Sequence, residues 1–113
     1  IKAEQYTLEF ANRDTWNEGV DDDTRKGFQV LKLFKEYGFE GEIGIGVSDV
    51  HVNEIESPEL IRDRILYAAK ALDDPTKVYV NPDCGLRTRS REVSFDKIRS
   101  IVKGAELARE EIK

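Results

Sequence analysis

Short apolar stretches alternate with longer stretches of helical periodicity along the 113-residue chain. Three of the short stretches combine aliphatic, aromatic and β-branched residues and end at turn-forming residues, as strands usually do. They cover Gln5–Ala11, Glu42–Val50 and Lys77–Asn81. The second is apolar on both of its faces and includes Gly44 and Gly46. The pattern therefore predicts three strands.

Three longer stretches repeat apolar residues every three or four positions, which predicts helices. Thr24–Tyr37 carries the first of these repeats, with Phe28, Leu31 and Phe34 at steps of three. The residues that widen its apolar stripe are Val30, Leu33 and Tyr37. The second begins at Ser57, because a Ser cap followed by Pro58 is a typical helix start, and the Asp-Asp-Pro sequence at 73–75 ends it. We expect Ser90 to cap the third helix. Its predicted inner face consists of Val93, Ile98, Ile101, Val102, Ala105, Ala108 and Ile112.

The regular alternation of strand and helix predicts an α/β fold with a parallel sheet and right-handed crossovers. A closed (β/α)8 barrel needs ~200 residues or more, so 113 residues cannot build one. Length and pattern together suggest three-eighths of a barrel or a small three-layer sheet. Three parallel strands make a poor free-standing sheet, because both faces and both edges need cover.

Composition and charge exclude several classes of protein. Lys and Arg number 18 and Asp and Glu number 23, for a net charge of −5, and the two signs are interleaved. This pattern argues against a nucleic-acid partner and against an anionic membrane surface. No apolar run approaches the ~18 residues of a membrane span. A single Cys excludes an internal disulfide framework and suits a cytoplasmic location. Since the chain has no Met, we expect a processed chain or a piece of a longer protein.

Residues capable of chemistry follow each predicted strand, at the end where parallel α/β folds place their active sites. Glu9 lies at the end of the first strand, Asp49 and His51 at the end of the second, and Cys84 after the third. A lone His or a strand Glu is more often structural, a single Cys is often a small buried residue, and Asn-Pro-Asp at 81–83 also fits ordinary turn chemistry. Together, a thiol and a carboxylate on one edge suggest a zinc site, although no CxxC or HxxxH pair supports it.

Several segments, read in order, resemble one known family. They are Tyr-Thr-Leu-Glu-Phe-Ala-Asn-Arg (6–13), Glu-Tyr-Gly-Phe (36–39), Ile-Gly-Ile-Gly-Val-Ser-Asp-Val-His (43–51), Ile-Glu-Ser-Pro-Glu (55–59) and Val-Asn-Pro-Asp-Cys-Gly-Leu-Arg-Thr-Arg (80–89). The chain is similar to the cobalamin-independent methionine synthases, in the last part of their C-terminal catalytic barrel. The resemblance extends from residue 5 to about residue 108.

The resemblance implies a zinc-dependent methyltransferase. Such an enzyme moves a methyl group from 5-methyltetrahydrofolate (polyglutamate), or a related donor, to homocysteine and makes methionine. By motif position, Glu9 and Cys84 match two of the family's four zinc ligands. His51 matches the His that helps to protonate the departing folate nitrogen, and Asp49 is its neighbour. The other two ligands, a His and a Cys, belong to a strand that would precede Glu9. We therefore expect the isolated chain to be inactive.

On this reading residues 1–113 form a C-terminal fragment of the barrel, a parallel βαβαβα segment made of its last three units. We expect strand order 1-2-3 with the helices on one face. Residues such as Leu8, Ile45 and Tyr79, or their neighbours, would form the other face, the former barrel interior. Uncovered edges and faces predict self-association. Two alternatives are a stand-alone, non-enzymatic βα domain that oligomerises or docks on a partner, and a generic α/β domain in which Cys84 and His51 are structural.

Overall fold

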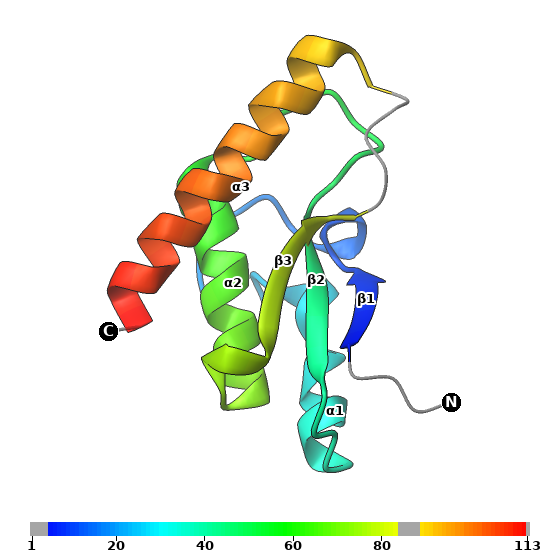
Figure 1. Cartoon of the computed structure of the whole chain (residues 1–113), viewed down its shortest axis with the longest axis vertical. Helices are drawn as coiled ribbons and strands as arrows, with labels where there is room; N and C mark the ends of the chain where they lie inside the picture. The colour runs from blue at the N-terminus through cyan, green and yellow to red at the C-terminus, as the bar shows by residue number, and fades with distance from the viewer. Residues whose placement is uncertain (1–4, 84–88, 113) are drawn as a thin grey trace.

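The computed structural model describes residues 5–83 and 89–112 (Figure 1). Its strands are β1 (Gln5–Glu9), β2 (Glu42–Ser48) and β3 (Val78–Pro82), and its α-helices are α1 (Leu31–Glu36), α2 (Pro58–Leu72) and α3 (Arg91–Ile112). Short 3-10 turns are η1 (Ala11–Arg13), η2 (Lys26–Phe28) and η3 (Pro75–Lys77). The predicted alternation of strands and helices is confirmed.

The three strands form one parallel sheet in the order β1-β2-β3, as predicted. Leu8 pairs with Ile45, and Ile45 with Val80, while Tyr79 pairs with Gly44 in the adjacent row. Because alternate residues of a strand point to opposite faces, Tyr79 lies on the face opposite to Leu8 and Ile45. The expectation that these three residues share the uncovered face is wrong for Leu8 and Ile45. Both pack in the helix-covered core, and their sequence neighbours occupy the other face.

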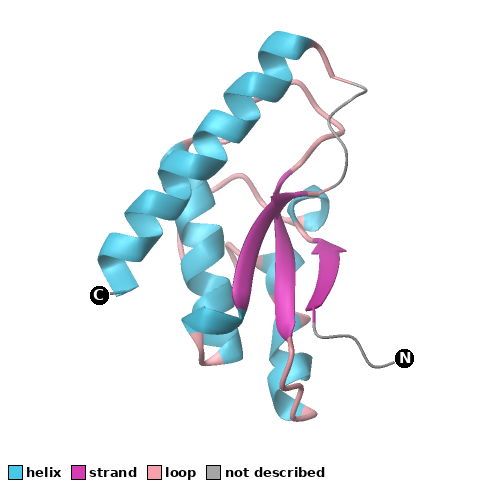
Figure 2. Ribbon diagram, viewed as in Figure 1, coloured by secondary structure: helices cyan, strands magenta, loops and turns pink. Residues whose placement is uncertain are grey.

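The hydrophobic core lies between the sheet and the helices (Figure 2). Ile43, Ile45 and Val47 alternate along β2 and are fully buried. The buried residues that they join from η2, α1 and α2 are Phe28, Leu31, Ile61, Ile65, Tyr67, Ala68 and Leu72. Successive side chains of β2 thus separate into a core row and a row that holds Gly44 and Gly46. No helix of the described residues covers the second face of the sheet.

The first helix is shorter than its apolar pattern predicts. Instead of one helix over Thr24–Tyr37, the chain forms η2 and then α1. The guanidinium of Arg25 is buried and donates to the carbonyl oxygen of Thr15 at 3.1 Å, which bends the chain here. Phe28 and Leu31 reach the core as predicted. The residues predicted to widen the apolar stripe are instead exposed: Val30, Leu33 and Tyr37.

The second helix follows its sequence signals closely. The Ser57 hydroxyl accepts a hydrogen bond from the Leu60 N–H at 3.1 Å, and Pro58 occupies the first turn. Asp73 ends the helix in the left-handed conformation, with φ of 57°. Both of the predicted boundaries of α2 are therefore confirmed.

The third helix packs on α2 through small residues, and only part of its predicted inner face is buried. A Cβ on Gly104 would lie 2.4 Å from Cγ2 of Ile61, so glycine permits the close approach of α2 and α3. Ile101 and Ala108 are buried as expected. Ile98, Val102 and Ile112 are exposed, contrary to the prediction. The remaining buried residues on this helix are Lys97, Ser100 and Gly104. The helix is thus rotated so that its buried face includes a charged side chain.

Across residues 5–83 and 89–112, we find no helix with both the length and the apolarity that a bilayer crossing requires.

Candidate functional site

The carboxyl ends of the three strands meet at one edge of the sheet, toward the top of Figure 1. Glu9 is the last residue of β1, and His51 lies in the loop that follows β2. The Glu9 Oε1 atom lies 3.5 Å from Nε2 of His51, and the two side chains are 46% and 58% exposed. Two residues that are 42 positions apart in the sequence are therefore neighbours on the surface of this edge. Cys84 lies outside the described residues.

Asp49 supports His51 through the backbone of the loop. Its Oδ1 atom accepts a hydrogen bond from the His51 N–H at 2.9 Å, and its side chain is nearly buried. The N–H of Asp49 in turn donates to Oε2 of Glu56 at 2.7 Å. Asp49 is therefore next to His51, as the sequence indicated, and its carboxylate contacts the His51 main chain.

Glu56 is a buried carboxylate placed between two cations, and it closes the loop after β2. Its Oε1 atom accepts from the Ser48 hydroxyl at 3.1 Å and from Lys97 Nζ at 3.3 Å. Its Oε2 atom accepts from an Arg64 guanidinium nitrogen at 3.2 Å. Glu56 is 1% exposed, and both cationic side chains are fully buried. Because a buried charge is tolerated only when it is paired, these contacts fix the loop against α2 and α3.

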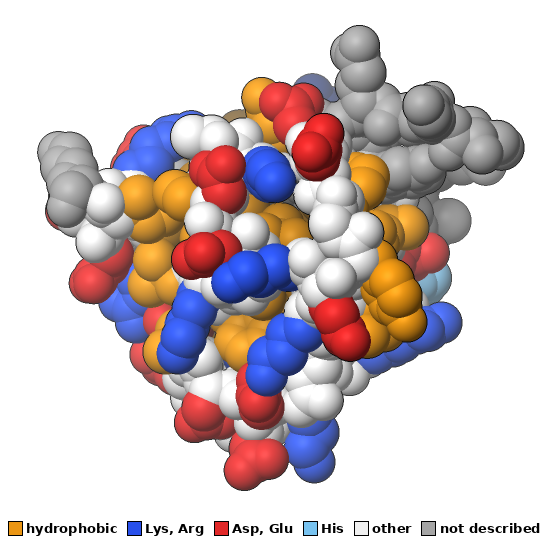
Figure 3. Space-filling model, turned by 90° about the horizontal axis from the view of Figure 1, so that it is seen from below, with side chains coloured by type: hydrophobic (Ala, Val, Ile, Leu, Met, Phe, Trp, Pro, Cys, Tyr) orange, Lys and Arg blue, Asp and Glu red, His pale blue; other side chains and the backbone are white. Residues whose placement is uncertain are grey.

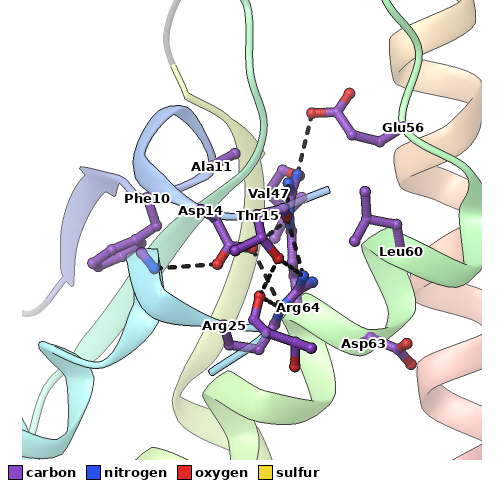
Figure 4. Close-up of polar contacts among 12 residues, drawn as sticks. Phe10, Ala11, Asp14, Thr15, Arg25, Val47, Glu56, Leu60, Asp63 and Arg64 are labelled. Carbon is purple, nitrogen blue, oxygen red and sulfur yellow. Dashed lines mark hydrogen bonds and ion pairs between the residues drawn. The ribbon is translucent and has the colours of Figure 1, made fainter. Parts of the chain in front are cut away.

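Arg64 extends this network from Glu56 to the loop that follows β1 (Figure 4). It donates to the Val47 carbonyl oxygen at 2.7 Å and to Oδ2 of Asp14 at 2.9 Å. The same Asp14 oxygen lies 3.4 Å from Nε of Arg25. The Nη2 atom of Arg25 donates to the Asn17 carbonyl oxygen. Burial lowers the pKa of the Arg25 guanidinium, and the Asp14 carboxylate counteracts that shift. Buried charges therefore connect the loop after β1 to the loop after β2.

Asp83 ties the end of β3 to the end of β1. Its Oδ1 atom accepts the N–H groups of Phe10 and Ala11, both at 3.1 Å, and its Oδ2 atom accepts that of Asn12 at 2.8 Å. Its own N–H donates to the Ser48 carbonyl oxygen at 2.9 Å. Burial raises the pKa of the Asp83 carboxyl to about 6, and the three N–H donors offset part of that rise.

The edge therefore combines an exposed reactive pair with a buried support. A carboxylate oxygen is a zinc ligand, and an imidazole can bind zinc or exchange a proton near neutral pH. Across residues 5–83 and 89–112, no group of three or more His, Cys, Asp or Glu side chains is arranged to hold a metal ion. Glu9 and His51, the exposed carboxylate and imidazole of the edge, do not belong to such a group within the described residues.

Comparison with known proteins now assigns the chain. The family described as "Cobalamin-independent synthase, Catalytic domain" matches residues 21–107. The chain belongs to the cobalamin-independent methionine synthase family. A methionine synthase of Thermoplasma acidophilum is 51% identical over 106 residues, which are 90% of this chain and 31% of that protein. A methionine synthase of Saccharolobus solfataricus is 42% identical over 88 residues, which are 76% of this chain and 26% of that protein.

A solved structure shows the same fold. It is that of a B12-independent methionine synthase from Shewanella sp. W3-18-1 in complex with selenomethionine. The two structures match with a TM-score of 0.71 and 24% sequence identity, and the match covers 96% of this chain and 27% of that chain. The sheet of this member of the methionine synthase family is open, in agreement with the predicted α/β segment. The chain spans about a third of the length of the curated relatives that it matches.

The supporting role of Asp83, Glu56 and Lys97 at the edge of this methionine synthase family member was not predicted from the sequence. Asp83 was compatible with an ordinary turn, and nothing near Glu56 marked it beyond its place before the Ser57 cap. Lys97 has charged and polar neighbours in the sequence and reads as a surface residue. The available signal for Asp83 was its position between a predicted strand and the only Cys, within the segment that carries the family resemblance.

Proposed function

We propose that this chain is the part of a zinc-dependent methionine synthase that supplies two zinc ligands, Glu9 and Cys84, and a proton donor, His51. The complete enzyme would transfer a methyl group from 5-methyltetrahydrofolate or a related donor to homocysteine. The family assignment supports the methionine-forming reaction. The donor, the thiol substrate and the metal are part of the proposal.

Glu9 has the chemistry and exposure that a zinc ligand needs. It lies at the end of a strand, on the face of the sheet opposite to the core. Within residues 5–83 and 89–112, its carboxylate has an exposed contact with His51 and no buried one. Cys84 would add a thiolate, the other donor type that zinc prefers. When bound, zinc would lower the pKa of a coordinated thiol and so favour the thiolate at neutral pH.

His51 would act on the leaving group. An exposed imidazole can give a proton to a departing amine, which is the step that makes a folate nitrogen a good leaving group. Asp49 would hold the His51 main chain, with its carboxylate bound to the His51 N–H. The observation that carries the proposal is the 3.5 Å separation of Glu9 Oε1 and His51 Nε2, since it brings the ligand and the proton donor of the family together.

The first experiment measures the size of the polypeptide in its native source with an antibody against the 113 residues. A band of roughly 300 residues or more, enough for a complete barrel, is expected. That native protein is then purified and its zinc content and methionine formation are measured. Glu9→Gln and Cys84→Ser should lose zinc and activity, while His51→Asn should keep zinc and slow methyl transfer about a hundredfold.

A matched control is Glu42→Gln, which makes the same change at the opposite end of the sheet. It should leave zinc and activity unchanged. A Cys84→Ser protein with full zinc and full activity would contradict the proposal. A native band near the size of the 113-residue chain would favour the second candidate function below.

The second candidate is a stand-alone βα domain that associates with a second copy of itself. Exposed apolar side chains on α3 favour it, because Phe95, Ile98 and Val102 are 62%, 49% and 52% exposed. Together they form one stripe of a helix. Light scattering after gel filtration would then show a dimer, and Val102→Glu would convert it to a monomer. A monomeric wild-type chain would exclude this candidate.

A further inference from the structure

We infer that Asp83 is the positioning residue of the carboxyl edge: its carboxylate and its N–H fix the segments that carry Glu9, Asp49 and His51 relative to the end of β3. The inference rests on the proposed function for its meaning in catalysis. The geometry that it asserts can be tested without that function.

The carboxylate of Asp83 organises the turn that directly follows Glu9. Phe10, Ala11 and Asn12 begin that turn, and their three N–H groups have no partner in the sheet ladder. All three donate to Asp83, which is 71 to 73 residues away in the sequence. Asp83 is only 4% exposed, so water does not compete with these bonds. An ionised acceptor that receives three N–H groups is among the stronger polar contacts in proteins.

The backbone of Asp83 makes the second connection. Its N–H donates to the Ser48 carbonyl oxygen at the end of β2, directly before Asp49. Glu9 precedes Phe10, and Cys84 follows Asp83, in the sequence. Through its side chain and its N–H, Asp83 therefore contacts the residues next to two of the four candidate site residues, Glu9 and Asp49. Asp49 in turn accepts a hydrogen bond from the N–H of His51.

The sheet leaves space for this carboxylate at one glycine. A Cβ on Gly46 would lie 2.1 Å from Oδ1 of Asp83 and 3.0 Å from the Leu8 carbonyl oxygen. The absence of a side chain at Gly46 thus lets Asp83 cross over β2 and reach the end of β1. A residue used only for a local turn after β3 would not need this passage.

Asp83 differs in kind from Glu9 and His51. It is buried and fully engaged with the protein, whereas both of those side chains are about half exposed. Asp83 therefore acts through the residues that it holds, and contact with substrate is left to the exposed pair.

The test compares Asp83→Asn with Asp74→Asn in the 113-residue chain by NMR. Asn keeps the shape of Asp but replaces one acceptor oxygen with an NH2 group, which must then face an N–H donor. Asp74 is the matched control, because its carboxylate accepts from the N–H and the hydroxyl of Thr76, at 2.9 and 2.6 Å, at the opposite end of β3. His51 is the only His in the sequence, so its ring signals are unambiguous.

The expected wild-type result is a nuclear Overhauser contact between the His51 ring and the Glu9 side chain. Asp83→Asn should abolish that contact in molecules that remain folded. It should also speed hydrogen exchange at Phe10, Ala11 and Asn12 at least about tenfold. Asp74→Asn should change neither measurement. A role in stability alone would lower the urea midpoint and leave the contact between Glu9 and His51 intact in the folded state, which would overturn the inference.

A measurement on the wild type keeps the inference testable if Asp83→Asn does not fold. The amides of Phe10, Ala11 and Asn12 should exchange more than about a hundredfold slower than an exposed amide. Free exchange at these positions would overturn the inference, and so would the absence of the Glu9 and His51 contact. These outcomes are independent of zinc content and methionine formation, so the inference and the proposed function can fail separately.

Discussion

The two ends of the sheet are built in opposite ways. At the carboxyl edge, the carboxylates of Glu56, Asp83 and Asp14 are buried and bind groups that are distant in the sequence. At the amino edge, polar contacts are exposed. Tyr79 donates to Glu42 at the surface, and Lys35 lies 3.3 Å from an Asp73 carboxylate that is 76% exposed. Figure 3, which views the molecule from below, shows acidic and basic side chains intermixed, with hydrophobic ones between them.

This difference indicates where the fold requires one fixed geometry. A buried carboxylate must keep its partners, because an unpaired buried charge costs several kcal/mol. An exposed ion pair contributes little, since water and salt compete with it. The carboxyl edge, where Glu9 and His51 lie, is thus held by interactions that permit few alternatives, whereas the amino edge can vary.

The largest expected effect comes from Glu56→Gln, which removes the negative charge of a buried side chain at the carboxyl edge. Lys97 and Arg64 would then be buried with no opposing charge at this position. We expect the free energy of unfolding to fall by about 3 kcal/mol, measured by urea unfolding of the 113-residue chain.

The matched change at the amino edge is Glu42→Gln, which alters a half-buried residue of the same type. It should change the free energy of unfolding by no more than about 0.5 kcal/mol. Equal losses at the two positions would show that the edges do not differ in the way proposed.

Tyr67→Phe, in the region between the two edges, should lower stability less than Glu56→Gln does, and its effect should depend on pH. The buried Tyr67 donates its O–H to Oδ1 of Asp22 at 2.7 Å, and burial raises the pKa of the Tyr67 phenol. Hydrogen bonds from Lys32 and Tyr67 lower the pKa of the Asp22 carboxyl below 3.8. The stabilisation that Asp22 provides is therefore complete above pH 3.8 and is lost as the pH falls through the lowered value.

Tyr67→Phe should consequently lower the urea midpoint at pH 7 by less than half as much as Glu56→Gln does. The difference from wild type should shrink in acid, once Asp22 is protonated. A difference that does not shrink at any pH below 3.8 at which the chain is still folded would mean that the lost contact is packing rather than the charged hydrogen bond.

A small gain in stability is expected at the amino edge. Asp73 ends α2 with φ of 57°, a conformation that glycine adopts more readily than other residues. Asp73→Gly should stabilise the chain by about 0.5 kcal/mol, because the exposed pair with Lys35 contributes little. The measurement is the thermal midpoint, and a decrease would show that the ion pair outweighs the backbone conformation.

Local signals in the sequence predicted most of the elements. The Ser57 cap, the Pro58 turn and the stop near Asp73 all appear in α2, because each depends on residues within a few positions. The prediction was wrong where a distant partner decided the outcome. Arg25 bends the segment before α1 toward Thr15, and Lys97 rotates α3 toward Glu56, so Ile98 and Val102 face outward.

For the candidate site, the sequence alone pointed to the edge of the sheet and to Glu9, Asp49, His51 and Cys84. The rule that active sites lie at the carboxyl ends of parallel strands depends only on strand order, which the alternation of elements predicts. The sequence could not predict that Glu9 and His51 lie 3.5 Å apart, or that Asp83 and Glu56 support them.

The sequence by itself determined the α/β alternation, the parallel order of strands and the family. Only the tertiary structure decided which charged residues are buried, which face of α3 is covered and how the strand ends are joined. The physical reason is that periodicity and caps act over a few residues, whereas the free energy of burying Glu56 or Asp83 depends on donors that lie up to 73 residues away.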